Sequence, residues 1–107
     1  MLKLKQQVEM LADNELLNSN KKFAPTFHTT HEGYAVIKEE IEEAADELEA
    51  INQMLNIVWS NVRRNSTANK NLLAIKKWSI NLAAESIQVA AMAQKYIDSF
   101  KEDKVNE

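Results

Sequence analysis

Residues 31–59 read HEGYAVIKEEIEEAADELEAINQMLNIVW, and this stretch decides the fold. Its apolar residues recur at steps of three and four and form one stripe along a helix: Tyr34, Ile37, Ile41, Ala44, Leu48, Ile51, Leu55 and Val58. Thr29 lies three residues before Glu32, the spacing of a capping box, in which a hydroxyl and a carboxylate satisfy free backbone N–H groups. We therefore predict a helix over residues 30–60.

The centre of this helix is an acidic block of seven carboxylates within residues 39–49, followed by no basic residue before Arg63. Like charges three or four residues apart repel by about 0.2–0.5 kcal/mol for each exposed pair, so we expect something to offset the repulsion. At about 100° per residue, Glu40 lies nearest the edge of the apolar stripe, and Glu47 and then Glu43 lie a little further round. Glu40 and Glu43 are the pair best placed at the rim of a packed core.

The composition predicts a single all-α domain over residues 1–107, an antiparallel bundle of three long helices. One Gly and one Pro in 107 residues are too few for many turns. Three helices make a thin core, so we expect self-association to complete it. The absence of cysteine excludes disulfides and fits a reducing compartment. No apolar run could span a bilayer and no signal-peptide pattern is present, so we expect a cytoplasmic protein without membrane contact.

The chain divides into five segments and a tail. We predict an N-terminal helix over 1–18, a loop over 19–29 that holds the only proline, the acidic helix over 30–60, a loop over 61–67 and a C-terminal helix over 68–101. Ser66 and Thr67 are the candidate N-caps of the last helix. The polar tail 102–107 is expected to fray.

Two phenylalanines and two histidines lie in or beside the first loop. Phe23 and Phe27 are expected either to anchor the loop on the helices or to line a base-binding pocket. The spacing of His28 and His31 matches no histidine metal motif, and a structural or solvated role stays open for both. His31, beside Glu32 at the helix start, is the better candidate for contacting phosphate.

Glu85 stands in an Ala-rich stretch without other acids. Asn81 and Gln88 form a narrow polar stripe with it, and this stripe continues to Lys95. An unpaired buried carboxylate costs several kcal/mol, so Glu85 needs a partner. Two explanations remain: a polar network between helices, or a ligand set that faces the carboxylate pair of the acidic helix.

The net charge of −3 conceals a separation of charges along the chain. Between the acidic block and Glu85 the only charged residues are basic: Arg63, Arg64, Lys70, Lys76 and Lys77. An acidic chain is a poor candidate for direct nucleic-acid binding. The basic segment either contacts a polyphosphate or forms one of two complementary solvated surfaces.

Two strings of this sequence, HEGYAVIKEEIEE at 31–43 and ESIQVAAMA at 85–93, resemble the MazG-like all-α nucleoside triphosphate pyrophosphohydrolases, in particular a small branch found in phages and prophages. The resemblance covers roughly residues 23–98. It implies a helical bundle, completed as a homodimer or homotetramer, that holds Mg²⁺ on carboxylates, with Mn²⁺ as an alternative. It further implies hydrolysis of a nucleoside triphosphate between the α- and β-phosphates, which yields a monophosphate and pyrophosphate.

The resemblance assigns site residues one by one. Glu40 and Glu43 match its first carboxylate pair, and Glu85 matches the first member of the second pair. Gln88 stands where the pattern has Asp, so a neutral amide replaces a negative charge. The candidates are Glu40, Glu43 and Glu47 for catalysis, with Glu47 as general base, Glu40, Glu43, Glu85 and Gln88 for the metal, and His31 and Lys95 for the substrate.

Two other functions remain as alternatives. Gln88 motivates a degenerate relative that binds metal or nucleotide without turnover. The acidic helix alone motivates a structural interaction protein that binds a basic partner, for which no dependence on divalent metal is expected.

Overall fold

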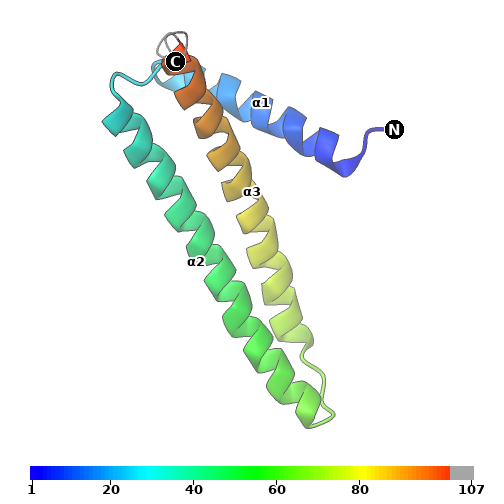
Figure 1. Cartoon of the computed structure of the whole chain (residues 1–107). Coiled ribbons are helices and arrows are strands. Elements are labelled where there is room, and N and C mark those ends of the chain that lie inside the picture. The colour runs from blue at the N-terminus through cyan, green and yellow to red at the C-terminus, as the bar shows by residue number, and fades with distance from the viewer. Residues whose placement is uncertain (102–107) are drawn as a thin grey trace.

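The computed structural model describes residues 1–101, which form three helices and no strand: α1 (Leu4–Lys22), α2 (Thr30–Arg63) and α3 (Asn69–Ser99) (Figure 1). The all-α prediction is confirmed for this part of the chain. The tail 102–107, predicted to fray, lies outside the described residues. None of the three helices combines the length and the apolar composition needed to cross a membrane.

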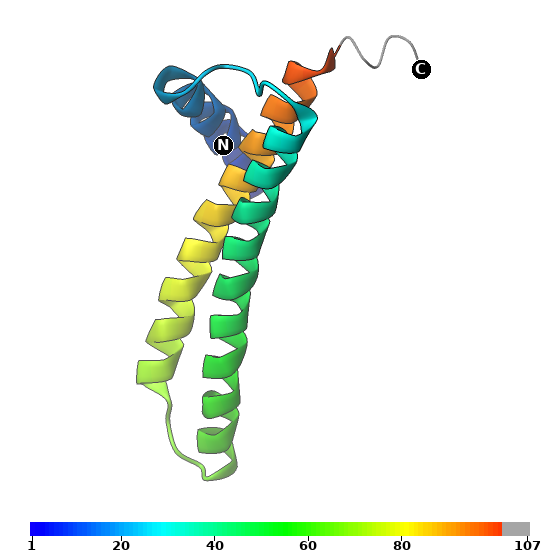
Figure 2. The ribbon, with the colours of Figure 1, turned by 90° about the vertical axis from the view of Figure 1, so that its left-hand side faces the viewer.

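α2 and α3 form a long antiparallel hairpin, and α1 lies obliquely across one end of it (Figures 1 and 2). The molecule measures 61 × 36 × 29 Å. The second half of α1 packs on α3 and brings Leu16 to the core. Its first half diverges, so Leu4, Val8 and Leu11 are exposed. The predicted bundle of three helices is therefore a two-helix hairpin with a third helix at one end.

The helix bounds differ from the prediction mainly in α1, which continues to Lys22 and not to residue 18. The polar residues that suggested a loop, among them Ser19 and Asn20, are half-buried. Packing against α3 overrides their weak helix propensity. α2 runs three residues further than predicted, to Arg63, and Asn65 reverses the chain in the left-handed region, at φ 57°.

The start of α2 is as predicted. The Glu32 N–H donates to Thr29 Oγ1 (3.0 Å), whereas the Glu32 carboxylate accepts the N–H of His28 (2.9 Å) rather than that of Thr29. The predicted N-caps of α3, Ser66 and Thr67, are wrong. Ala68 occupies that position without a side-chain bond. Ser66 belongs to the turn that follows α2, where its N–H donates to Asn61 O (2.9 Å).

The core of the described residues is small and lies where α1, the first loop and α3 meet. Phe27, Ala91 and Met92 are buried there, and partly buried hydrophobic residues surround them: Leu16, Val36, Ile37, Tyr96 and Phe100. The Phe27 N–H donates to Ser99 Oγ (2.9 Å), which anchors the loop on α3. Phe27 therefore anchors the loop as one interpretation expected, but Phe23 is 70% exposed.

Gly33 sets the approach of α2 to this core. A Cβ at this position would lie 2.5 Å from Tyr96 Cδ2 and 3.0 Å from Phe27 Cδ2. We expect Gly33→Ala to destabilise the fold, because overpacking costs about 1–3 kcal/mol and the better helix propensity of Ala returns at most about 1 kcal/mol. The free energy of unfolding in urea, measured for both proteins, shows whether the substitution destabilises the fold. A variant as stable as the wild type would show that the Tyr96 ring moves aside freely.

Candidate metal centre

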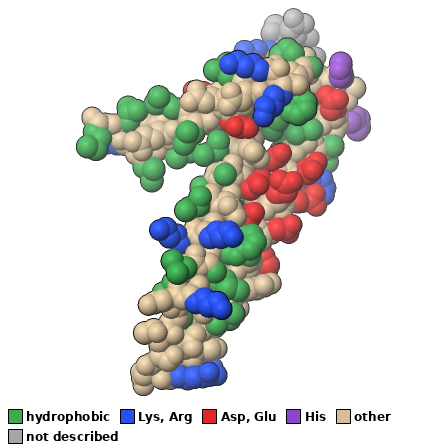
Figure 3. Space-filling model, turned by 180° about the vertical axis from the view of Figure 1, so that it is seen from behind, with side chains coloured by type: hydrophobic (Ala, Val, Ile, Leu, Met, Phe, Trp, Pro, Cys, Tyr) green, Lys and Arg blue, Asp and Glu red, His purple; other side chains and the backbone are tan. Residues whose placement is uncertain are grey.

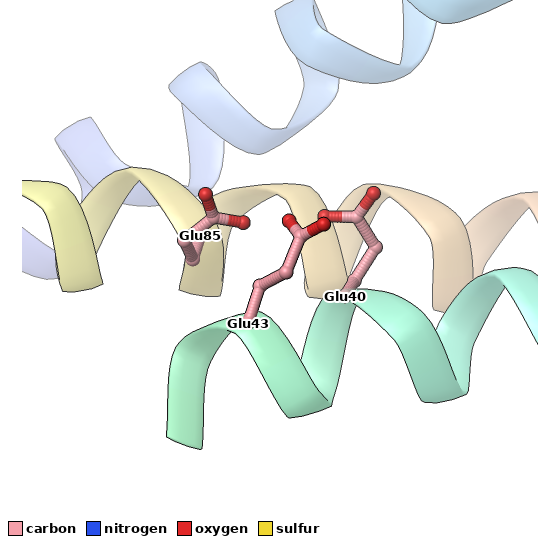
Figure 4. A group of neighbouring side chains, drawn as sticks. All are labelled: Glu40, Glu43 and Glu85. Atoms are coloured by element: carbon pink, nitrogen blue, oxygen red, sulfur yellow. The ribbon is translucent and has the colours of Figure 1, made fainter. Parts of the chain in front are cut away.

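Three carboxylates converge between the two long helices. Glu40 and Glu43 lie one turn apart on α2, and Glu85 faces them from α3 (Figure 4). One oxygen of each side chain lies within 4.8 Å of the others. Glu40 and Glu85 are half-buried and Glu43 is exposed, so the group is open to solvent on the Glu43 side. The chain thus brings together three of the four predicted metal ligands from two helices.

In the described part of the chain, no basic side chain forms an ion pair with Glu40, Glu43 or Glu85. Within residues 1–101 the ion pairs are Lys38 with Glu42 (3.3 Å) and Lys101 with Asp98 (3.4 Å). Burial raises the pKa of Glu85 to about 7, assisted by a hydrogen bond to Glu43 and by repulsion from its two neighbours. Burial, followed by repulsion from Glu43, also raises the pKa of Glu40. The arrangement favours either a shared proton or a bound cation.

Gln88, the fourth predicted ligand, joins the group through its amide. The hydrogen-bonding requirements of its neighbours are met when the amide nitrogen faces the carboxylates. In that orientation Nε2 donates to Glu40 Oε2 (2.8 Å) and Glu85 Oε2 (3.3 Å). In this orientation Gln88 compensates negative charge as a donor. Rotation of the amide by 180° would present its oxygen instead, and Gln88 could then act as a neutral ligand.

The raised pKa of Glu85 predicts how the stability of the metal-free protein depends on pH. The folded state holds the Glu85 proton more tightly than the unfolded chain, whose carboxyl has an ordinary pKa of 4.5. The stabilisation is therefore complete below pH 4.5 and is lost as the pH rises through about 7. We expect the melting temperature, measured in chelator, to decrease as the pH rises from 4.5 to about 7. Glu85→Gln should remove most of this decrease. The control Glu49→Gln, further along α2, should keep it; equal slopes in both variants would contradict the assignment.

A pocket of about 590 Å³ adjoins the carboxylates, a volume in the range of small-molecule sites. Glu40 and Gln88 both line this pocket. Glu40 is also a member of the cluster of three carboxylates, and Gln88 donates hydrogen bonds to that cluster. Other lining residues come from α1, the first loop and α2: Glu15, Asn18, Ser19, Lys22, Phe23, Ala24, Thr26, Phe27, His28, Glu32 and Val36. Figure 3 shows acidic side chains gathered on the half of the hairpin nearest α1, while lysine and arginine side chains lie both at the α1 end and along the other half.

Lys95 is the buried cation of this pocket, only 4% exposed. Its Nζ lies 3.5 Å from Ser19 Oγ and 5.1 Å from the centroid of the Phe27 ring. None of the ion pairs in the described chain involves it. A buried ammonium held by one long hydrogen bond and an aromatic face favours an anionic ligand beside it.

The other two candidates, Glu47 and His31, are not members of the three-carboxylate cluster, although Glu47 follows Glu43 by one turn on α2. Glu47 is half-buried, and its Oε2 is buried without a hydrogen-bond partner in the described structure. His31 is exposed in the first turn of α2 and does not line the pocket, whereas His28 does.

The contribution of α1 to the pocket was not predicted from the sequence. Glu15 and Asn18 line the pocket because α1 lies across α3, and Lys22 does so because α1 also extends past residue 18. The sequence feature that could have indicated this contribution is the basic pair Lys21-Lys22 directly before Phe23, which places positive charge beside an aromatic ring.

Comparisons with protein families, with characterised proteins and with solved structures return no match to this chain.

Proposed function

We propose that this protein is a divalent-metal-dependent nucleoside triphosphate pyrophosphohydrolase of the MazG-like kind, active with Mg²⁺ or Mn²⁺ and assembled as a homodimer or homotetramer in the cytoplasm. The observation that carries the proposal is the sharing of Glu40 between the three-carboxylate group and a pocket that contains Lys95. A metal beside a pocket with a buried cation suits a charged phosphate chain. The resemblance of residues 31–43 and 85–93 to that family supplies the type of reaction.

The donor set fits a hard cation. Mg²⁺ takes oxygen ligands, keeps several waters and bridges substrate phosphates, so a few carboxylates suffice. Glu40, Glu43 and Glu85 would hold it, and Gln88 would join through its amide oxygen after rotation. Such an ion would withdraw charge from the phosphates and lower the pKa of an attacking water.

The residues around the ion would divide the remaining work. The orphaned carboxylate oxygen of Glu47 would take the proton of the attacking water. The water oxygen would bond to the α-phosphorus as the bond to the bridging oxygen breaks, and pyrophosphate would leave. Lys95 would pair with phosphate oxygens, and the exposed ring of Phe23, with Phe27, would contact the base.

Pyrophosphate release from a panel of ribo- and deoxynucleoside triphosphates tests the proposal, with Mg²⁺, Mn²⁺ or chelator. We expect metal-dependent release with a monophosphate as the other product. Release of inorganic phosphate and a diphosphate would contradict cleavage between the α- and β-phosphates, and no release across the panel would contradict turnover.

Gln88 favours a second candidate, a relative that binds without turnover. Its amide already compensates Glu40 and Glu85 through hydrogen bonds, which weakens the need for a cation. A melting shift that requires both metal and nucleotide, without pyrophosphate release, would support this candidate. Indifference of the melting temperature to metal and nucleotide would favour the structural interaction protein instead.

A further inference from the structure

The five basic side chains that lie between the acidic block and Glu85 in the sequence do not belong to the candidate metal centre. They are Arg63, Arg64, Lys70, Lys76 and Lys77. All five are exposed, and none of them lines the pocket beside the carboxylates. The two ion pairs within residues 1–101 do not involve them. Their positive charge is therefore available to a partner.

These five residues share one end of the molecule. They belong to residues 50–84, which form the half of the α2–α3 hairpin remote from α1 and which we call the basic half (Figures 1 and 2). All 16 acidic residues of the chain lie outside it. Along the axis of α2, Arg63 is about 30 Å from Glu43 at about 1.5 Å per residue. The basic half is therefore a surface separate from the carboxylates.

α2 presents an aromatic and polar stripe within the basic half. Its positions follow steps of four, three and four, and we call it the Trp59 stripe: Asn52, Asn56, Trp59 and Arg63. At about 100° per residue, these positions fall within about 60° of the helix circumference. All four side chains are exposed, Trp59 by 59%. The hydrogen bonds between side chains and their neighbours in this part of the described chain do not include them.

The Trp59 stripe has the chemistry that binds a single-stranded nucleic acid. Proteins hold single strands with cations along the phosphate backbone and with aromatic rings on which unpaired bases stack. Trp59 supplies the ring, and Arg63 lies one turn further along α2 with a guanidinium for phosphate. The amides of Asn52 and Asn56 both donate and accept hydrogen bonds, as base edges require.

We propose that the basic half of the hairpin binds a single-stranded nucleic acid, with a base stacked on Trp59 and the phosphates paired with Arg63 and the basic side chains around it. The net charge of −3 predicts poor binding by the chain as a whole. The fold, however, keeps every described acid outside the basic half, so the local charge there is purely positive. The proposal goes beyond the proposed hydrolysis and does not depend on it.

The loop at the end of the hairpin favours a nucleic acid over a lipid surface. Leu73 and Ile80 are exposed on α3, so an anionic membrane is the main competing partner. The loop that would enter a membrane first, however, presents the exposed polar residues Asn65, Ser66 and Thr67. Segments that enter the membrane interface carry Trp, Phe or Leu. Asn, Ser and Thr side chains instead donate hydrogen bonds to phosphate oxygens.

Fluorescence anisotropy with a labelled oligothymidylate of about 15 nucleotides tests the proposal. The measurement is made in chelator, so that no cation on the carboxylates contributes to binding. We expect binding that weakens with salt, with a slope of log K against log salt of about −0.7 for each phosphate neutralised. A duplex of the same length should bind more weakly, because its bases are not free to stack.

Substitutions in the Trp59 stripe test which residues bind. Trp59→Leu should lower the affinity by about 10-fold or more, whereas Trp59→Phe should keep most of it because the ring remains. The double variant Arg63→Gln with Arg64→Gln should flatten the salt slope by about 1.4. The matched control is Lys5→Gln with Lys101→Gln, which changes the charge equally at exposed sites outside the basic half. Equal losses in the two double variants would overturn the proposal.

Three further results would also overturn it. The first is the absence of oligonucleotide binding at low salt. The second is tighter binding to vesicles of phosphatidylserine and phosphatidylcholine than to the oligonucleotide, which would identify a lipid surface. The third is a wild-type oligomer that Arg63→Gln with Arg64→Gln dissociates, which would assign the basic half to the acidic block of a second copy. Circular dichroism confirms that each variant keeps its helices.

Discussion

Glu43→Gln should lower metal-dependent pyrophosphate release by about 10²–10³-fold while leaving the helical content unchanged. Glu43 is the exposed member of the carboxylate group, so its substitution removes a ligand charge without opening a cavity. Its loss would leave the metal with the carboxylates of Glu40 and Glu85 alone. Steady-state kinetics over a range of Mg²⁺ and Mn²⁺ concentrations measure the effect.

Glu42→Gln is the matched control for this prediction. Glu42 is the adjacent residue on α2, is exposed, and pairs with Lys38 (3.3 Å) away from the carboxylate group. It changes the net charge by the same amount, so a general electrostatic effect would lower both activities equally. Full activity in Glu43→Gln would remove this carboxylate from the mechanism.

Lys95→Met should raise the KM for a nucleoside triphosphate by about 10–100-fold and leave the protein as stable as the wild type or more so. Met keeps most of the volume of the buried side chain. It also removes an ammonium whose nearest polar contact in the described chain is the long hydrogen bond to Ser19. Loss of affinity together with kept stability would distinguish a phosphate ligand from a structural lysine. Titration with a non-hydrolysable triphosphate and thermal melting provide the two measurements.

Lys101→Met serves as its control, because Lys101 is exposed just after α3 and pairs with Asp98 (3.4 Å). Its KM should match that of the wild type. If Lys95→Met binds nucleotide normally but melts early, the buried cation serves the packing of α1 and Phe27 rather than the substrate.

Local pattern alone determined the helical class, the start of α2 and the half-buried positions of Glu40 and Glu47. It did not determine which part of the apolar stripe is covered. Ile37, Ala44, Ile51 and Val58 are half-buried, whereas the other four residues of the stripe are exposed: Tyr34, Ile41, Leu48 and Leu55.

Thr29 could be predicted as the N-cap because the capping hydrogen bond joins residues that lie within four positions of each other in the sequence. The half-buried Glu40 and Glu47 could be separated from the exposed Glu39 and Glu42 because helical periodicity fixes which face a residue occupies. The Ala-rich surroundings of Glu85 likewise indicated that its carboxylate needs a partner.

The tertiary structure decided what depends on contacts between distant segments. α1 continues through residues 19–22 because α3 covers its polar side, and this extension brings Lys22 to the pocket wall. Where Phe23, Phe27 and His28 lie follows from the path of a loop tied to Ser99, 72 residues after Phe27. Helical periodicity depends on residues that are close in the sequence, so it can be predicted from local pattern. The angle at which one helix crosses another depends on which side-chain surfaces meet, and those contacts exist only in the folded chain.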